Sequence, residues 1–162
     1  MKKILVSLLV AAMVGATLTG CGSKSEGGNG ASVEQTSSVS AKDVVDKLKE
    51  YIPMPMEPTE EEAKDIYHLN LEDVESYGIA LTGRSPGVGF AMVVKAKEGK
   101  VDAVKASVDK VLEDRVGAAF YPDEKEVAEK AKVEVDGNFV SLLIFNDDVV
   151  DEATQAYKDA IK

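Results

Sequence analysis

The chain has 162 residues, a formal charge of −10 from 29 acidic and 19 basic side chains, and one cysteine. This length fits one globular domain with appendages. A single cysteine excludes an internal disulfide framework and a multi-cysteine zinc site, and a single histidine excludes a histidine-rich metal centre. The acidic balance argues against binding of nucleic acid, which requires a basic face.

The N-terminus has the layout of a secretion signal. Lys2 and Lys3 precede the apolar run Ile4–Val14, which is too short to span a bilayer as a mature helix. The run leads into Leu18-Thr19-Gly20-Cys21, where a branched apolar residue and two small residues precede the only cysteine. This segment resembles the lipobox of bacterial lipoproteins.

The lipobox implies cleavage between Gly20 and Cys21 and attachment of a diacylglyceryl group to the Cys21 thiol. The alternative is that Cys21 is an ordinary small residue after a conventional signal peptide. Cleavage would remove Lys2 and Lys3 and no acid, and would take the formal charge from −10 to −12. An anionic lipid surface repels such a domain. Attachment to the outer face of the bacterial cytoplasmic membrane would therefore depend on the lipid at Cys21.

Three segments are expected along the chain. Residues 1–20 form the signal peptide, and residues 21–40 form the lipidated cysteine with a flexible tether rich in glycine and serine. Residues 41–162 form one domain, because periodic hydrophobicity begins there.

Two short helices are expected at the start of the domain. Ser40 is a suitable N-cap for the first helix, and Pro53 ends it. Thr59 and Glu62 have capping-box spacing and begin the second. The residues expected to face inward on the second helix are Ala63, Ile66 and Tyr67.

A proline-rich connector, Pro53–Pro58, joins these helices and carries two methionines. The simpler interpretation is that Met54 and Met56 fill irregular gaps in the core. The alternative is an adaptable apolar surface that contacts a partner.

Four strands and three further helices are expected after residue 73. Strands are expected over 74–82, 90–97, 131–136 and 139–145, and helices over 101–120, around 125–130 behind Pro122, and over 149–161. The run to Phe120 is interpreted as an amphipathic core helix. The order α-α-β-β-α-α-β-β-α predicts an α+β domain, with a four-stranded, mainly antiparallel sheet and helices packed chiefly on one face.

Several segments together resemble the DUF4358 family, described as lipoproteins of Firmicutes. They are the lipobox with its tether and the residues 41–45, 65–77, 93–101 and 135–140. The resemblance covers roughly residues 41–161 and implies a secreted, lipid-anchored domain of unknown function, with no catalytic motif to carry over. The loop Gly83–Gly89 is richer in glycine than the family pattern.

That loop is the one chemically unusual segment. The sequence contains no recognisable hydrolase, nucleotide-binding or metalloprotease motif, so we expect no enzyme activity and no cofactor. Exposed amides beside Arg84 are a candidate site for a carboxylate or phosphate. The alternative is a long hairpin connection with Arg84 in solvent. The residues of this candidate ligand loop are Gly83, Arg84, Ser85, Gly87 and Gly89.

His68 is the only histidine in the sequence, and acidic residues lie near it, so that together they could serve as an acid and a base. It is interpreted as a helix-terminal histidine rather than as an acid or base. Acidic groups at residues 60–62, 123–126 and 147–148 are oxygen ligands of the type that calcium prefers. Most fall at expected helix starts, where they favour the helix dipole without a metal.

The sequence therefore predicts a lipid-anchored, non-enzymatic binding or interaction domain. One alternative is a small-anion or solute binder that uses the Arg84 loop. The other is an accessory module that docks on another envelope protein through the sheet or through Met54 and Met56.

Overall fold

The computed structural model describes residues 38–162. The expected signal peptide, the expected cleavage position at Gly20 and Cys21, and most of the expected tether lie outside the described residues. In the described part of the chain, no helix is both long and apolar enough to cross a membrane.

Five α-helices and five strands make up the domain. The helices are α1 (Ala41–Leu48), α2 (Glu60–Asp65), α3 (Val101–Ala118), α4 (Pro122–Lys130) and α5 (Val150–Ala160), and a 3-10 turn, η1 (Lys49–Tyr51), follows α1. The strands are β1 (Pro55–Met56), β2 (Val74–Thr82), β3 (Phe90–Ala96), β4 (Val133–Asp136) and β5 (Phe139–Ile144).

All five strands form one sheet in the order β1-β2-β3-β5-β4, and every neighbouring pair is antiparallel. The prediction of an α+β domain with an antiparallel sheet is therefore confirmed. The four expected strands are β2 to β5, and the sheet contains one more. The extra strand β1 comes from the proline-rich connector, where Met56 pairs with Leu81.

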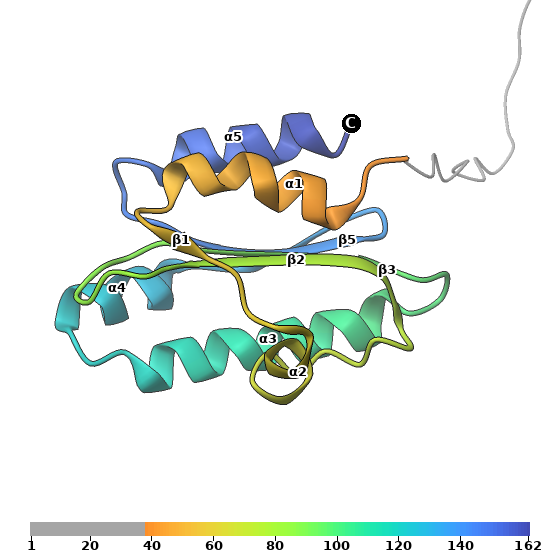
Figure 1. The fold of residues 1–162 in the computed structure, drawn as a ribbon, viewed down its shortest axis with the longest axis horizontal. Coiled ribbons are helices and arrows are strands. Elements are labelled where there is room, and N and C mark those ends of the chain that lie inside the picture. Colours follow the sequence, from red (N-terminus) through yellow and green to blue (C-terminus); the bar gives the residue numbers. More distant parts are fainter. Residues whose placement is uncertain (1–37) are drawn as a thin grey trace, which may run out of the picture. The chain divides into compact units, whose positions relative to one another are not determined.

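The helices cover both faces of the sheet, and the expectation that they pack chiefly on one face is wrong. Figure 1 shows α1 and α5 on one side and α2, α3 and α4 on the other. The physical reason lies in β3, whose seven residues are all buried. Because successive side chains of a strand point to opposite faces, a strand buried throughout requires cover on both sides.

The two faces of β2 differ in the size of their side chains. On β2, Gly78 and Ala80 face α1, and Ile79 between them faces the cluster under α3. A methyl group on Gly78 would lie 2.8 Å from Cβ of Val45 and 2.9 Å from the carbonyl oxygen of Ala41. The small residues thus let α1 approach the sheet closely.

The caps of the first two helices form as predicted. The Ser40 side chain accepts a hydrogen bond from the Asp43 amide, and Thr59 and Glu62 form a reciprocal capping box. Two expected core residues are instead on the surface, since Ile66 is 56% exposed and Phe120 is 87% exposed. Both lie beyond the last residue of their helices, because α2 ends at Asp65 and α3 at Ala118.

The C-terminal helix is fixed to the β4–β5 hairpin by a polar cluster. The fully buried Tyr157 donates a hydrogen bond from its hydroxyl to Asp136 at 3.0 Å. Lys158 forms ion pairs with Asp136 at 2.8 Å and Glu134 at 2.9 Å. Burial raises the pKa of the Tyr157 phenol, and the hydrogen bond to Asp136 raises the pKa of the Lys158 ammonium.

Gly78→Ala is expected to destabilise the domain by about 1–3 kcal/mol, because the added methyl group overlaps α1 and forces it away from the sheet. The free energy of unfolding in urea measures the change. Gly117→Ala is the matched control, since nothing beyond its own stretch of helix lies within 4 Å of its added methyl group. Alanine is the better helix former, so the control should match or exceed the wild type by up to about 1 kcal/mol. Equal stability of Gly78→Ala and wild type would contradict the close packing of α1.

The free energy of unfolding is expected to fall as the pH rises above about 10. The unfolded chain releases protons from Tyr157 and Lys158 at their ordinary pKa values, whereas the folded protein holds them to higher pH. The stabilisation that comes from these two raised pKa values is therefore fully present below about pH 10 and is lost as the pH rises above it. Urea midpoints measured between pH 7 and 11 give the slope of the free energy of unfolding against pH. Tyr157→Phe should make this slope shallower. Parallel slopes for the two proteins would rule out the contribution of Tyr157.

Candidate functional site

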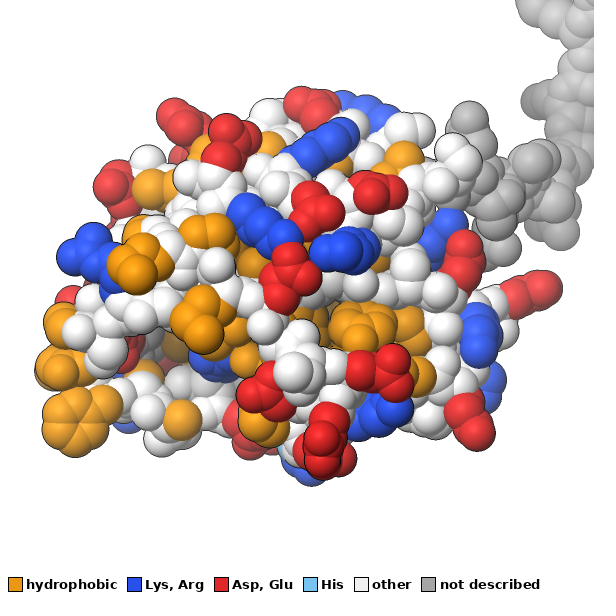
Figure 2. Space-filling view, viewed as in Figure 1, with side chains coloured by type: hydrophobic (Ala, Val, Ile, Leu, Met, Phe, Trp, Pro, Cys, Tyr) orange, Lys and Arg blue, Asp and Glu red, His pale blue; other side chains and the backbone are white. Residues whose placement is uncertain are grey.

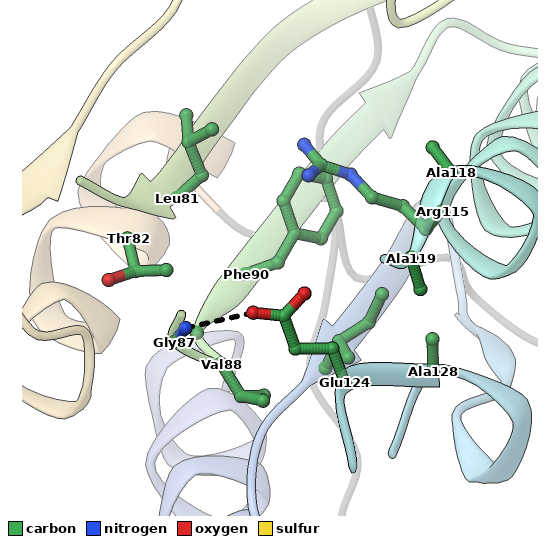
Figure 3. A pocket seen from close by; sticks show the side chains of 12 residues that line it. Leu81, Thr82, Gly87, Val88, Phe90, Arg115, Ala118, Ala119, Glu124 and Ala128 are labelled. Carbon is green, nitrogen blue, oxygen red and sulfur yellow. Dashed lines mark hydrogen bonds between the residues drawn. The ribbon is translucent and has the colours of Figure 1, made fainter. Parts of the chain in front are cut away.

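A cavity of about 170 Å³ lies at one end of the sheet, on the face that carries α3 and α4. A row of apolar side chains across three adjacent strands contributes to its floor. Leu81 of β2 pairs with Phe90 of β3, which pairs in turn with Ile144 of β5. Figure 3 shows the cavity, and Figure 2 shows that this end of the domain surface is hollowed between apolar side chains.

Small residues keep the cavity open. Ala118 and Ala119 at the end of α3 and Ala128 of α4 line its walls, together with the loop segment Gly87–Gly89 at the end of the β2–β3 connection. Larger side chains at the three alanine positions would fill this space, as they do elsewhere in the core. Among residues 38–162, the charged side chains that line the cavity are Arg115 of α3 and Glu124 of α4.

The guanidinium of Arg115 lies over aromatic rings. Its central carbon is 4.2 Å from the ring centre of Phe90 and 5.5 Å from that of Tyr67. Those two rings are nearly parallel, with centres 6.0 Å apart. Nη2 of Arg115 also donates a hydrogen bond to the Tyr67 hydroxyl at 3.0 Å. Cation–π attraction and one hydrogen bond to a neutral hydroxyl therefore hold the side chain in place.

Arg115 has no carboxylate partner within ion-pair distance among residues 38–162. This is notable in a chain with ten more acids than bases, where an exposed lysine such as Lys130 contacts both Glu126 and Asp147. A guanidinium carries five N–H donors, and the Tyr67 hydroxyl accepts from one of them. The half-buried Arg115 therefore retains unused donors at the wall of an apolar cavity.

Glu124 holds the loop that borders the cavity. One of its carboxylate oxygens accepts a hydrogen bond from the Gly87 amide at 2.9 Å. Figure 3 shows this bond, with the Glu124 carboxylate pointing toward Gly87 and the Arg115 guanidinium lying over the Phe90 ring. The second carboxylate oxygen of Glu124 accepts no hydrogen bond from the part of the chain that the structure describes.

The loop Gly83–Gly89 is only partly at the cavity. Gly87 and Gly89 line it, whereas Gly83, Arg84 and Ser85 do not. Three of the loop amides have acceptors: the Gly83 amide donates to the Met54 carbonyl, the Arg84 amide to the Thr82 hydroxyl and the Gly87 amide to Glu124. The Arg84 side chain is exposed, so the arginine at the cavity is Arg115.

His68 does not cap its helix with its ring. Its Nε2 atom lies 2.6 Å from a carboxylate oxygen of Asp114 in α3, and its backbone is left-handed, with φ of 54°. Tyr67 and Arg115 form the adjacent contact between the same two segments. The segment after α2 is therefore fixed to α3 by two neighbouring polar contacts, one of which sets the position of Arg115.

The two connector methionines lie on the surface. Met54 is 68% exposed and Met56 is 58% exposed, so the interpretation that they fill gaps in the core is wrong. Met56 belongs to β1 at the edge of the sheet, and Met54 directly precedes this strand.

The acidic groups near the helix starts serve other purposes. Glu62 completes the capping box, Glu60 pairs with Lys64, and Glu126 and Asp147 pair with Lys130. Over residues 38–162, no group of three or more acidic, histidine or cysteine side chains is arranged to hold a metal ion.

The sequence analysis did not identify Arg115 or Glu124 as site residues, although the sequence carries a signal for both. The inward positions of α3 follow a spacing of four and three residues through Val104, Val108 and Val111, and the next two positions are Arg115 and Ala118. Glu124 precedes the buried Ala128 by four residues on α4. A charged residue at an inward position of an amphipathic helix is the pattern that identifies both.

The groups that line the cavity can bind a small molecule. The one hydroxyl group among the lining side chains belongs to Thr82, and it donates to the Pro53 carbonyl at 2.8 Å. The cavity offers an apolar floor, one cation with unused donors and one carboxylate. These groups can hold a small molecule in a defined orientation.

Residues 51–145 match the family model described as "Domain of unknown function (DUF4358)". This segment covers more than half of the chain and includes the cavity. No curated protein and no solved structure matches the chain.

Proposed function

The chain thus belongs to the DUF4358 family, and we propose that its domain is a lipid-anchored, non-enzymatic module that binds a small carboxylate at Arg115. The observation that carries the proposal is a half-buried guanidinium, without a carboxylate partner among the described residues, at the wall of an apolar cavity. A partly desolvated guanidinium forms strong, directional hydrogen bonds to a carboxylate.

The stacking of Arg115 supports this role. Phe90 and Tyr67 are 3% and 5% exposed, and they hold the guanidinium in one orientation before any ligand arrives. Little side-chain entropy is then lost on binding, which favours affinity for a small ligand. The cavity volume of about 170 Å³ also limits the size of the ligand. A cavity of about 150 Å³ is enough to hold benzene, so this cavity admits a molecule of similar size.

The site in this proposal differs from the Arg84 loop. Arg84 lies outside the cavity lining, and the loop contributes Gly87 and Gly89 to the cavity border. The chain contains two arginines, so each can serve as the control for the other.

The anchor in this proposal is the lipid on Cys21, which would hold the domain at the outer face of the bacterial cytoplasmic membrane. Its support is the order of the basic start, the apolar run and Leu18-Thr19-Gly20-Cys21 in the sequence. Two or three acyl chains suffice for stable attachment, where one chain is marginal.

Cys21→Ala is expected to abolish incorporation of a labelled fatty acid and to release the protein from the membrane fraction, since the acceptor thiol is lost. Ser23→Ala is the matched control and should retain both label and membrane attachment. Continued labelling of Cys21→Ala would disprove the lipobox assignment.

Propionate is expected to raise the melting temperature of the full chain relative to chloride at the same ionic strength. A ligand at 100 times its dissociation constant adds about 2.7 kcal/mol, which raises the melting temperature of a domain of this size by several degrees. Arg115→Met should lose the shift while keeping an unbranched side chain over Phe90. Arg84→Met should keep the shift.

A shift lost in Arg84→Met and kept in Arg115→Met would move the site to the glycine-rich loop. No shift from any small carboxylate would favour the docking alternative. The specific observation behind that alternative is the exposure of Met56 on the edge strand β1 and of Met54 directly before it.

A further inference from the structure

We propose that the cavity binds a zwitterion, specifically a free α-amino acid with a small apolar side chain, by pairing Arg115 with its carboxylate and Glu124 with its ammonium group. The inference rests on the carboxylate-binding role proposed for Arg115 and adds the second charge of the ligand.

The charges of the cavity lead to this ligand class. Arg115 and Glu124 are its two charged lining residues, so the site carries one positive and one negative group. A simple anion would be attracted by Arg115 and opposed by Glu124 and by the acidic chain as a whole. A simple cation would be opposed by Arg115. A zwitterion satisfies both groups and brings no net charge into the cavity.

Glu124 is already positioned for a second hydrogen bond. The Gly87 amide fixes one carboxylate oxygen at 2.9 Å, and within residues 38–162 the other oxygen accepts no hydrogen bond. An ammonium group carries three donors and can bind that oxygen. The carboxylate would thus hold the loop and the ligand together.

The apolar surface and the volume set the size of the ligand. Leu81, Phe90 and Ile144 form a continuous row across three strands, with the Arg115 guanidinium over Phe90, and this row can cover an aliphatic side chain. A cavity of about 170 Å³ admits one small molecule. Because both charges line the same small cavity, a single ligand can contact both.

Three molecules of similar size test the inference. Alanine carries both charges, propionate lacks the ammonium group and ethylamine lacks the carboxylate. Titration calorimetry on the full chain is expected to show alanine binding at least about tenfold more tightly than propionate, as one added charge-assisted hydrogen bond implies. Ethylamine should bind more weakly than alanine by a similar factor.

Glu124→Gln supplies the decisive variant, because its amide oxygen can still accept the Gly87 hydrogen bond while the charge is removed. It should reduce alanine affinity to that of propionate and leave propionate binding intact or stronger. Asp123→Asn removes a charge from the exposed neighbouring residue of the same helix turn and should leave the preference for alanine unchanged.

The outcomes separate the two proposals. Equal binding of alanine and propionate, or an unchanged preference in Glu124→Gln, would overturn the zwitterion and leave the carboxylate site standing. Ethylamine binding as tightly as alanine would overturn both, since Arg115 would then have no role. Absence of binding by all three molecules would also overturn both.

Discussion

Burial of β3 on both faces is the constraint on which the rest of the domain depends. All seven residues of β3 are buried, so neither face of the central strand can contact water. The helices must therefore be divided between the faces, with α1 and α5 on one side and α2, α3 and α4 on the other (Figure 1). That division brings the ends of α3 and α4 to one end of the sheet, where the cavity forms.

The cavity exists because several of the side chains between the helices and the sheet become smaller at this end. Along most of α3, valines such as Val104, Val108 and Val111 fill the space between helix and sheet. Near its end the inward positions carry Arg115 and Ala118, and the nearby wall of α4 carries Ala128. A guanidinium stacked on aromatic rings replaces an aliphatic contact, and small side chains leave space beside it. The same packing that stabilises the core thus leaves one end able to accept a ligand.

Much of the fold was predictable from local patterns, because each strand and helix has its own periodicity. The expected strand over 74–82 coincides with β2, and Ser40 and Thr59 cap their helices as their spacing indicates. The two-residue strand β1 has no periodic signal, since its pairing depends on β2. The cover on both faces was missed even though Gly78 and Ala80 alternate with Ile79, a pattern that indicates two packed faces. For the site, the glycine-rich loop made Arg84 the candidate binding residue. The inward spacing of α3 instead places Arg115 at the cavity.

Because the chain has two arginines, their Nε–H groups give two cross-peaks in a nitrogen–proton correlation spectrum, and Arg84→Met assigns them. Titration with propionate then tests directly whether Arg115 is the binding cation. The account predicts that the Arg115 cross-peak moves and reaches saturation while the Arg84 cross-peak stays in place. It would be contradicted if the Arg115 cross-peak did not move, or if both cross-peaks drifted together in proportion to the added salt.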